Sequence, residues 1–164
     1  MNGKALYAGS FDPVTNGHLD IINRAALQYP KLVIGVISNP SKTSKFTLDE
    51  RKEMVKSVTG HLPNTEVTCF SGLMADFVDD NDFDVVIRGL RAITDFEYEI
   101  QMAQMNARLY KNNVETIFLM TSPSYSFVSS KLINEVYALG GNVKGLVPDK
   151  ILEIMDRKRR GDDI

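Results

Sequence analysis

The sequence predicts an α/β fold in which a doubly wound sheet of five parallel strands carries helices on both faces. Two observations support this prediction. Five short apolar runs mostly lack alternation of polar and apolar residues, which is typical of parallel strands covered on both faces. Longer segments with helical periodicity separate these runs, and parallel strands need such crossovers. The predicted order, βαβαβαβαβαα, indicates a single Rossmann-like domain over residues 1–164, with ligands bound outside the carboxyl ends of the strands.

The apolar runs place the five strands at residues 4–9, 32–37, 66–70, 84–89 and 116–120. Helical periodicity places six helices at residues 16–29, 47–62, 73–80, 95–111, 129–139 and about 148–160, followed by a flexible tail at 161–164. Residues 47–50 match the capping-box pattern at the start of the second helix. Pro30 is expected to end the first helix, and Gly140-Gly141 to end the fifth. Pro148 suits the first position of the last helix.

Length and composition narrow the class of protein. The chain has 164 residues, of which 43% are hydrophobic and 24% charged, as in one soluble globular domain. No apolar run approaches the ~20 residues of a membrane span, and the net charge of −2 argues against general nucleic-acid binding. The N-terminus lacks the pattern of a secretory signal, and Cys69 is the only cysteine. We therefore expect a cytoplasmic protein with Cys69 in its core.

The loops that follow the strands are rich in hydroxyl groups, glycines and basic residues. Because the carboxyl ends of parallel strands meet at one edge of the sheet, we expect these loops to converge there. The basic residues of this edge are Lys42, Lys45, Arg88, Arg91 and Lys131. Such a set predicts a site for a polyanion, although a lysine in a polar loop is often only solvated.

The stretch GSFDPVTNGH, residues 9–18, joins the first strand to the first helix. Free amide groups at the start of a helix favour an anion there, and Gly17 allows a ligand to approach the backbone closely. The helix dipole disfavours a charged imidazole, so we expect His18 to be a neutral hydrogen-bond donor. His61, near a helix end, is expected to have a structural role.

Arg88 lies at the end of an apolar strand, where a buried guanidinium needs an anionic partner. That partner is either a ligand phosphate or the acidic cluster DFEYE at residues 95–99, and the sequence leaves both open. The helix that contains this cluster has more apolar positions than one buried stripe needs, which permits a contact between subunits.

Two short motifs indicate a known superfamily. TNGH, residues 15–18, matches the T/H-x-G-H signature of the nucleotidylyltransferases, and VSSK, residues 128–131, resembles their second signature. The bacterial phosphopantetheine adenylyltransferase family is similar in more stretches, up to about Pro148: GSFDPVTNGHLDII, NPSK, FTLDER, LM, IRGLRAITDFEYE, MN and SYSFVSSKLINEV. The resemblance implies transfer of AMP from ATP to 4′-phosphopantetheine, which yields dephospho-coenzyme A and pyrophosphate in coenzyme A biosynthesis.

The resemblance also implies a role for each matching residue. It places His18 as the group that stabilises the transition state, with Lys42 and Arg91 at the reacting phosphates. The residues matched to the phosphopantetheine site are Ser10, Lys42, Met74 and Arg88. Those matched to the ATP site are Ser10, Phe11, His18, Gly89, Leu90, Arg91, Glu99, Tyr125, Ser126, Phe127, Val128, Ser129, Ser130 and Lys131. Ser10 and Lys131 depart from the family pattern, in which threonine and serine are common at these positions.

The resemblance further implies Mg²⁺ as a cofactor and a homohexamer of two trimers. We expect phosphates and water to hold the ion, so no metal-ligating residue is assigned. A phosphate monoester is already ionised at neutral pH, so the reaction needs positioning and charge neutralisation rather than a general base. Two alternatives stay open. One is a nucleotidylyltransferase for nicotinamide mononucleotide or a sugar or alcohol phosphate, and the other is a nucleotide-binding protein without catalysis.

Overall fold

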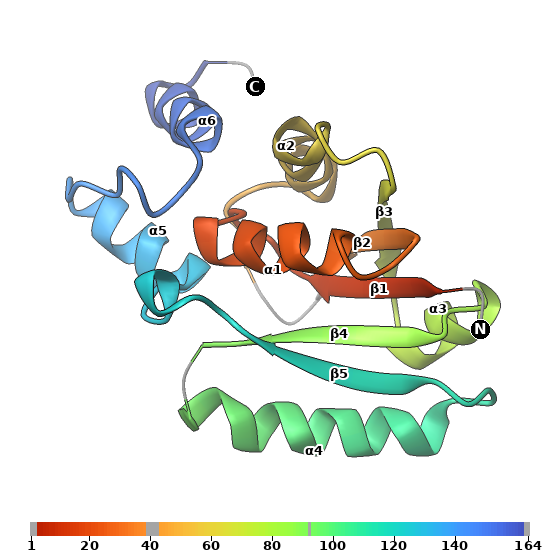
Figure 1. The fold of residues 1–164 in the computed structure, drawn as a ribbon. Helices are drawn as coiled ribbons and strands as arrows, with labels where there is room; N and C mark the ends of the chain where they lie inside the picture. The colour runs from red at the N-terminus through yellow and green to blue at the C-terminus, as the bar shows by residue number, and fades with distance from the viewer. Residues whose placement is uncertain (1–2, 39–42, 92, 163–164) are drawn as a thin grey trace.

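A sheet of five parallel strands in the order β3-β2-β1-β4-β5 forms the centre of the molecule (Figure 1). The structure is a computed structural model that describes residues 3–38, 43–91 and 93–162. Its strands are β1 (Lys4–Gly9), β2 (Lys31–Ser38), β3 (Thr65–Ser71), β4 (Val85–Leu90) and β5 (Glu115–Met120). The predicted parallel sheet is confirmed, and every strand begins and ends within one residue of its expected bounds.

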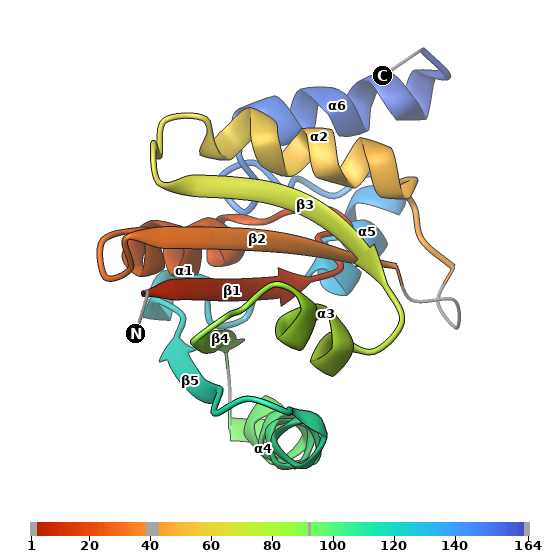
Figure 2. The ribbon, with the colours of Figure 1, turned by 90° about the vertical axis from the view of Figure 1, so that its right-hand side faces the viewer.

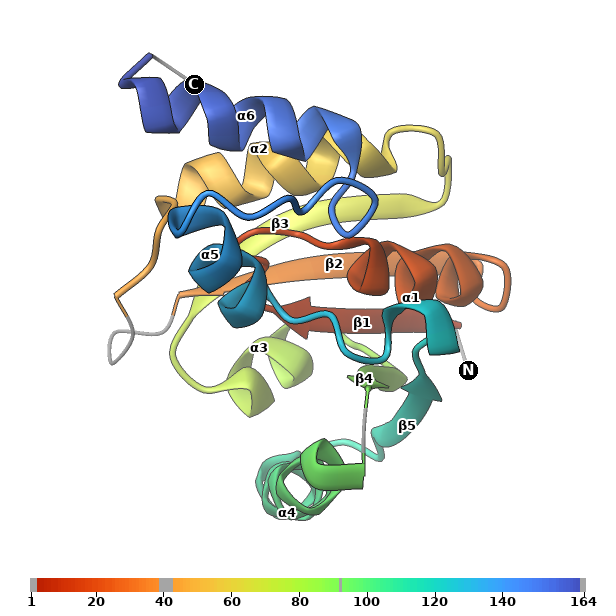
Figure 3. The ribbon, with the colours of Figure 1, turned by 90° about the vertical axis from the view of Figure 1, so that its left-hand side faces the viewer.

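Helices connect the strands and cover both faces of the sheet (Figures 2 and 3). They are α1 (Asn16–Ala26), α2 (Leu48–Thr59), α3 (Met74–Asp80), α4 (Ile93–Leu109), the 3₁₀ helix η1 (Pro123–Tyr125), α5 (Ser130–Ala138) and α6 (Asp149–Arg160). Right-handed crossovers put α1 and α2 on one face, where α5 and α6 join them, and α3 and α4 on the other. None of the helices in the described ranges has the length and apolar character to cross a bilayer.

Apolar clusters on the two faces hold these layers together. Successive residues of β1 point to opposite faces, so Tyr7 belongs to the cluster under α1 and α2, while Leu6 belongs to the cluster under α3. Ile151 of α6 is fully buried in the first cluster, which therefore extends beyond the sheet to the last helix. Cys69, expected in the core, packs against the same cluster from β3 but is only partly buried.

The helix ends agree with the sequence expectations at several positions. Thr47 Oγ1 accepts the Glu50 N–H at 3.2 Å, and the Glu50 carboxylate accepts the Thr47 N–H at 2.6 Å, which confirms the capping box of α2. Gly140 follows α5 with a φ of 81°, in the left-handed region that glycine adopts without strain. Gly161 ends α6 in the same way with a φ of 80°.

Several expected helix bounds are wrong, among them the ends of the second and fourth helices, which are Thr59 and Leu109 instead of residues 62 and 111. The first helix ends at Ala26, because the N–H groups of the next residues turn back to the Ala25 carbonyl before Pro30 is reached. The fourth helix begins at Ile93, two residues earlier than expected. Pro148 precedes the last helix as its extended cap instead of occupying its first position.

The C-terminal helix α6 is attached to α2 through a lysine. Lys158 Nζ donates to both carboxylate oxygens of Glu50, at 2.8 and 2.7 Å, and lies 4.8 Å from the centroid of the Phe46 ring. On the α5 side, the Tyr137 hydroxyl donates to Asp156. Through these contacts α6 stabilises the start of α2 and the residues just before it. Those residues lie at the carboxyl edge of the sheet.

Candidate active site

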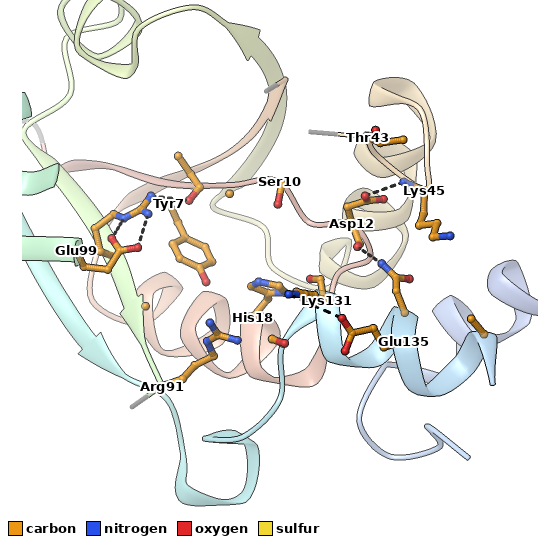
Figure 4. Close-up of a pocket in the computed structure, with 18 residues that line it drawn as sticks. Tyr7, Ser10, Asp12, His18, Thr43, Lys45, Arg91, Glu99, Lys131 and Glu135 are labelled. Carbon is orange, nitrogen blue, oxygen red and sulfur yellow. Dashed lines mark hydrogen bonds and ion pairs between the residues drawn. The ribbon is translucent and has the colours of Figure 1, made fainter. Parts of the chain in front are cut away.

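A cavity of about 760 Å³ opens where β1 and β4 end, at the point where the strand order reverses. The N-termini of α1 and α5 and the segment before α2 complete its walls (Figure 4). It lies at the edge of the sheet where the sequence predicted a polyanion site. The predicted residues that line it are Ser10, His18, Arg88, Gly89, Arg91, Glu99, Ser129, Ser130 and Lys131.

Seven of the predicted residues that the structure describes lie outside the walls of this cavity, and the first four are Phe11, Leu90, Val128 and Met74. Phe11 and Leu90 are buried in the core, with 1% and 4% of their surfaces exposed. Val128 lines a separate, smaller cavity of about 60 Å³. Met74 begins α3 and packs against the apolar cluster on the opposite face of the sheet.

The other predicted residues are placed as follows. Residues 125–127 include the end of η1 and the turn after it, and none of them lines the large cavity. The Lys131 side chain is 86% exposed and extends toward Glu135, with 3.9 Å between the charged atoms. Lys45 lines the cavity, whereas Lys42 lies outside the described residues.

Thr15 and His18 form a reciprocal cap at the start of α1. Thr15 Oγ1 accepts the His18 N–H at 3.3 Å, and His18 Nδ1 accepts the Thr15 N–H at 3.0 Å. A backbone amide can only donate, so Nδ1 carries no proton and the neutral ring is protonated on Nε2. The cap therefore leaves an Nε2–H donor on a residue that lines the cavity.

The surroundings of His18 keep its imidazole neutral. Burial, followed by the positive charge of Arg91, lowers the pKa of His18 from 6.5 to about 4. The Phe11 ring packs edge-on against the imidazole with 5.1 Å between ring centroids. Phe11 itself is buried in the core, so it helps to fix the orientation of the His18 ring. The neutral donor expected from the helix dipole is thus explained by burial and a neighbouring cation.

Arg88 and Glu99 form a bidentate ion pair on the wall of the cavity. Arg88 Nε donates to Glu99 Oε2 at 2.7 Å and Nη2 donates to Oε1 at 2.9 Å, while Nη1 donates to the Ala8 carbonyl at 3.2 Å. Burial alone would lower the pKa of Arg88, but Glu99 holds it above its usual value. The acidic cluster therefore supplies one anionic partner of this arginine, and the side chain still lines the cavity.

Arg91 connects the end of β4 to the segment before α5. Its Nη1 donates to the Val128 carbonyl at 3.2 Å, and the residue lines both the large and the small cavity. Ser129 caps α5 by accepting the Leu132 N–H at 3.0 Å, and Ser130 donates to the Pro13 carbonyl at 2.7 Å. Because α1 and α5 both begin at the cavity, two positive helix ends face the space that the arginines flank.

Arg51 of α2 is a residue that the sequence prediction missed. It is only 3% exposed, and its guanidinium donates to backbone carbonyls instead of a carboxylate. Its acceptors lie in three segments: Ser10 at 2.7 Å, Ile37 at 3.0 Å, Phe46 at 3.2 Å and Thr47 at 3.3 Å. One feature of the sequence could have revealed it: Arg51 lies on the apolar stripe of α2, three residues before Met54.

The sequence prediction also missed Asp12. Its hydrogen-bond partners lie far away in the sequence, and an Asp-Pro pair in a turn does not indicate them. Its carboxylate accepts the N–H groups of Lys45 and Phe46 at 2.8 and 2.9 Å, and its carbonyl accepts from Asn134 at 2.9 Å. It therefore joins the first loop to the segment before α2 and to α5 (Figure 4). Asp12 and Arg51 together determine the shape of the wall around Ser10.

The donors of the cavity suit phosphate groups more than a protein-held metal ion. The carboxylates that line it in the described ranges each have a partner: Asp12 binds loop amides, Glu99 binds Arg88, and Glu135 lies near Lys131. Across the part of the chain that the structure describes, no three His, Cys, Asp or Glu side chains are grouped to hold a metal. Arginines, hydroxyls and helix amides remain as the chemistry of the site.

Fold and site together define a class: a Rossmann-like α/β protein with a nucleotide-type phosphate site at the switch point of its sheet. The profile of the family described as cytidylyltransferase-like matches residues 6–136. The phosphopantetheine adenylyltransferase of Clostridium tetani (strain Massachusetts / E88) is 49% identical over 154 residues, which cover 94% of this chain and 96% of the relative.

Two further relatives that are also named phosphopantetheine adenylyltransferase agree. The protein of Anaeromyxobacter dehalogenans (strain 2CP-C) is 49% identical over 158 residues, covering 96% of each chain. That of Alkaliphilus oremlandii (strain OhILAs) is 49% identical over 154 residues, covering 94% of this chain and 98% of the relative. The chain therefore belongs to the cytidylyltransferase-like family and, within it, to the phosphopantetheine adenylyltransferase family.

Proposed function

We propose that this protein transfers AMP from ATP to 4′-phosphopantetheine and releases dephospho-coenzyme A and pyrophosphate. The observation that carries the proposal is the convergence of the His18 Nε2 donor, Arg88 and Arg91 on one cavity between two helix N-termini. Relatives named for this activity, 49% identical over nearly the whole chain, support the choice of substrates. The reaction belongs to coenzyme A biosynthesis, and we propose the cytoplasm as its location.

The proposed reaction is a direct in-line displacement. An oxygen of the acceptor phosphate forms a bond to the α-phosphorus of ATP, and the bond from that phosphorus to the bridging oxygen breaks, so that pyrophosphate leaves with the electron pair. No proton has to be removed from an ionised phosphate, which agrees with a neutral His18 whose free nitrogen donates. The protein contributes alignment and compensation of the charge that develops on the phosphate oxygens.

The residues divide this work according to their positions. Arg88 is proposed to bind the acceptor phosphate from the β4 wall, and Arg91 to bind phosphates of ATP near the start of α5. His18 Nε2–H would donate to an oxygen on the reacting phosphorus. Ser10, directly after β1, lines the same cavity and is held in place through its carbonyl by Arg51. Lys42 is proposed to act at the same phosphates.

Mg²⁺ is proposed as the cofactor of the reaction. Because the carboxylates described around the cavity already have partners, phosphate oxygens and water would supply most of its ligands. The ion would reduce the repulsion between the two anionic substrates. Omitting Mg²⁺, or adding a chelator, is expected to suppress pyrophosphate release.

The test of the function is an assay for pyrophosphate release with ATP and a set of phosphate acceptors. We expect turnover with 4′-phosphopantetheine and only background rates with nicotinamide mononucleotide, sugar phosphates or alcohol phosphates. Faster turnover with one of those acceptors would assign the protein to another nucleotidylyltransferase activity. ATP binding without pyrophosphate release from any acceptor would indicate a binding protein instead.

A homohexamer is proposed as the functional assembly. Large apolar side chains are exposed along α4 and on the neighbouring edge strand β5: Phe96, Tyr98, Met102, Met105, Leu109, Ile117 and Met120. Exposure of so many apolar side chains on two adjacent elements favours a contact between subunits. Multi-angle light scattering during gel filtration should report about six times the chain mass of 18.3 kDa. A monomeric mass would contradict the proposal.

A further inference from the structure

Tyr7 lies in the middle of the central strand β1, opposite Ile34 of β2 and Ile87 of β4. Only 5% of its surface is exposed, and its ring packs edge-on against Phe11 at 5.6 Å between centroids. Tyr7 nevertheless lines both the large cavity and the small one, which it shares with His18 and other residues (Figure 4). The exposed part of this tyrosine is therefore at the floor of the candidate active site.

The hydroxyl of Tyr7 has no hydrogen-bond partner among the described residues. Among the described residues the Tyr7 Oη is not one of the enclosed polar atoms without a partner, so it is open to the cavity, where a bound ligand can reach it. Gly89 of β4 leaves it room, because a Cβ at that position would lie 3.2 Å from the Tyr7 Oη. The absence of a side chain at Gly89 thus leaves room for the Tyr7 hydroxyl, although a phenylalanine ring would also fit at this position.

The charges around this hydroxyl determine what it can bind. Burial raises the pKa of Tyr7, and the opposing effects of Arg88 and Arg91 are smaller, so the group stays protonated at neutral pH. The carboxylates of Glu99 and Asp20 also act on this hydroxyl, but Glu99 is paired with Arg88, and Asp20 accepts from Arg24 and from the Ser122 N–H. A protonated hydroxyl near two arginines suits an anionic oxygen of a ligand, such as a phosphate oxygen.

We propose that Tyr7 is a further catalytic residue, whose hydroxyl donates a hydrogen bond to a phosphate oxygen of the reacting group beside the His18 Nε2 donor. This inference rests on the proposed function and extends it by one residue. The hydroxyl keeps its proton throughout, so no covalent step passes through it. Tyr7 approaches the phosphate from the sheet, whereas His18 approaches it from α1.

The test is the variant Tyr7→Phe, which removes the hydroxyl and keeps the ring. Because that hydroxyl lacks a partner in the free protein, the melting temperature should stay the same or rise. The kcat for pyrophosphate release should fall on the order of 10²-fold, as it does when one transition-state donor is removed. The matched control is Tyr110→Phe, which removes a buried hydroxyl outside the large cavity and should leave kcat unchanged.

The dissociation constant of ATP, measured calorimetrically without an acceptor, gives an independent readout. Loss of a hydrogen bond to an anion should weaken ATP binding by roughly tenfold in Tyr7→Phe. If the unaltered protein does not turn over 4′-phosphopantetheine, the proposed function fails, and this measurement still tests Tyr7. Equal ATP affinity in the unaltered protein and the variant would then overturn the inference. In an active protein, a kcat of Tyr7→Phe within about twofold of the unaltered value would overturn it as well.

Discussion

Glu99 holds Arg88 in a two-point ion pair at the edge of the cavity, with nitrogen to oxygen distances of 2.7 and 2.9 Å. The carboxylate comes from α4 and the guanidinium from the end of β4, so the pair fixes the arginine in one orientation. A guanidinium fixed in this way is preorganised for a phosphate and loses little side-chain entropy when the phosphate binds.

Replacing Arg88 with alanine should weaken binding of the acceptor. We expect the KM for 4′-phosphopantetheine to rise more than tenfold, on the scale of a lost charge-assisted hydrogen bond, and the KM for ATP to change by less than about threefold. Steady-state kinetics with each substrate varied in turn would separate the two effects. The opposite pattern, with ATP binding lost and acceptor binding retained, would reverse the proposed assignment.

Replacing His18 with alanine should remove the donor to the reacting phosphate. The expected loss in kcat is on the order of 10²- to 10³-fold, with the far-ultraviolet circular dichroism of a folded protein. His61→Ala is the matched control, since His61 is exposed and the hydrogen bond described for its side chain is to Asn23. Turnover of His18→Ala close to that of His61→Ala would remove His18 from the mechanism.

The stability of the protein should depend on pH through His18. Its pKa is about 4 in the folded protein, below the 6.5 of an unfolded chain, so the unfolded state binds the proton more readily. The contribution is fully present above pH ~6.5 and is lost as the pH falls toward ~4. Allowing for the partial exposure of the side chain, it amounts to about 2 kcal/mol.

Urea unfolding at several pH values between 4.5 and 7.5 would measure this effect. The variant His18→Gln cannot titrate, so its free energy of unfolding should fall less steeply below pH 6.5 than that of the unaltered protein. Parallel curves for the two proteins over this range would show that the pKa of His18 is not lowered.

Replacing Arg51 with methionine should damage both stability and activity. Four backbone carbonyls would lose their donor, and we expect a loss of about 3 kcal/mol in the free energy of unfolding. Because one of these carbonyls belongs to Ser10, kcat/KM should fall even at a temperature where the variant is fully folded. Lys56→Met, on the exposed side of the same helix, should change stability by less than about 0.5 kcal/mol.

Urea titrations give the free energies of unfolding for both variants, and initial rates below the melting temperature give kcat/KM. A fully active Arg51→Met protein would show that the shape of the Ser10 wall does not depend on this arginine. An equal loss of stability in Lys56→Met would show that the cost comes from the helix and not from the carbonyl contacts.

The sheet was predictable because its signal is local. Each strand is a continuous apolar run, and such runs in a βα alternation leave few arrangements other than a doubly wound sheet. The end of α1 was missed because the turn at Ala25 closes the helix earlier than Pro30 requires. A proline marks where a helix cannot continue, and other residues can end it sooner.

The site was only partly predictable because several of its contacts join segments far apart in the chain. Lys45 and Arg88 could be placed at the carboxyl edge from topology alone, and the structure puts both on the cavity wall. Tyr7 gave no such signal, since an aromatic residue in an apolar strand is normally part of the core. Arg51 and Asp12 act through backbone groups of distant loops, and those partners become known only once the chain is folded.

The reciprocal cap between Thr15 and His18 ties the position of one proton to the first turn of a helix. While that turn is formed, the Thr15 amide occupies Nδ1 and the imidazole proton stays on Nε2. If the turn frays, the amide is released, both tautomers become accessible and the ring is free to rotate. Inactivation on mild heating should therefore precede global unfolding, and exchange of the His18 amide hydrogen with solvent should follow the loss of activity.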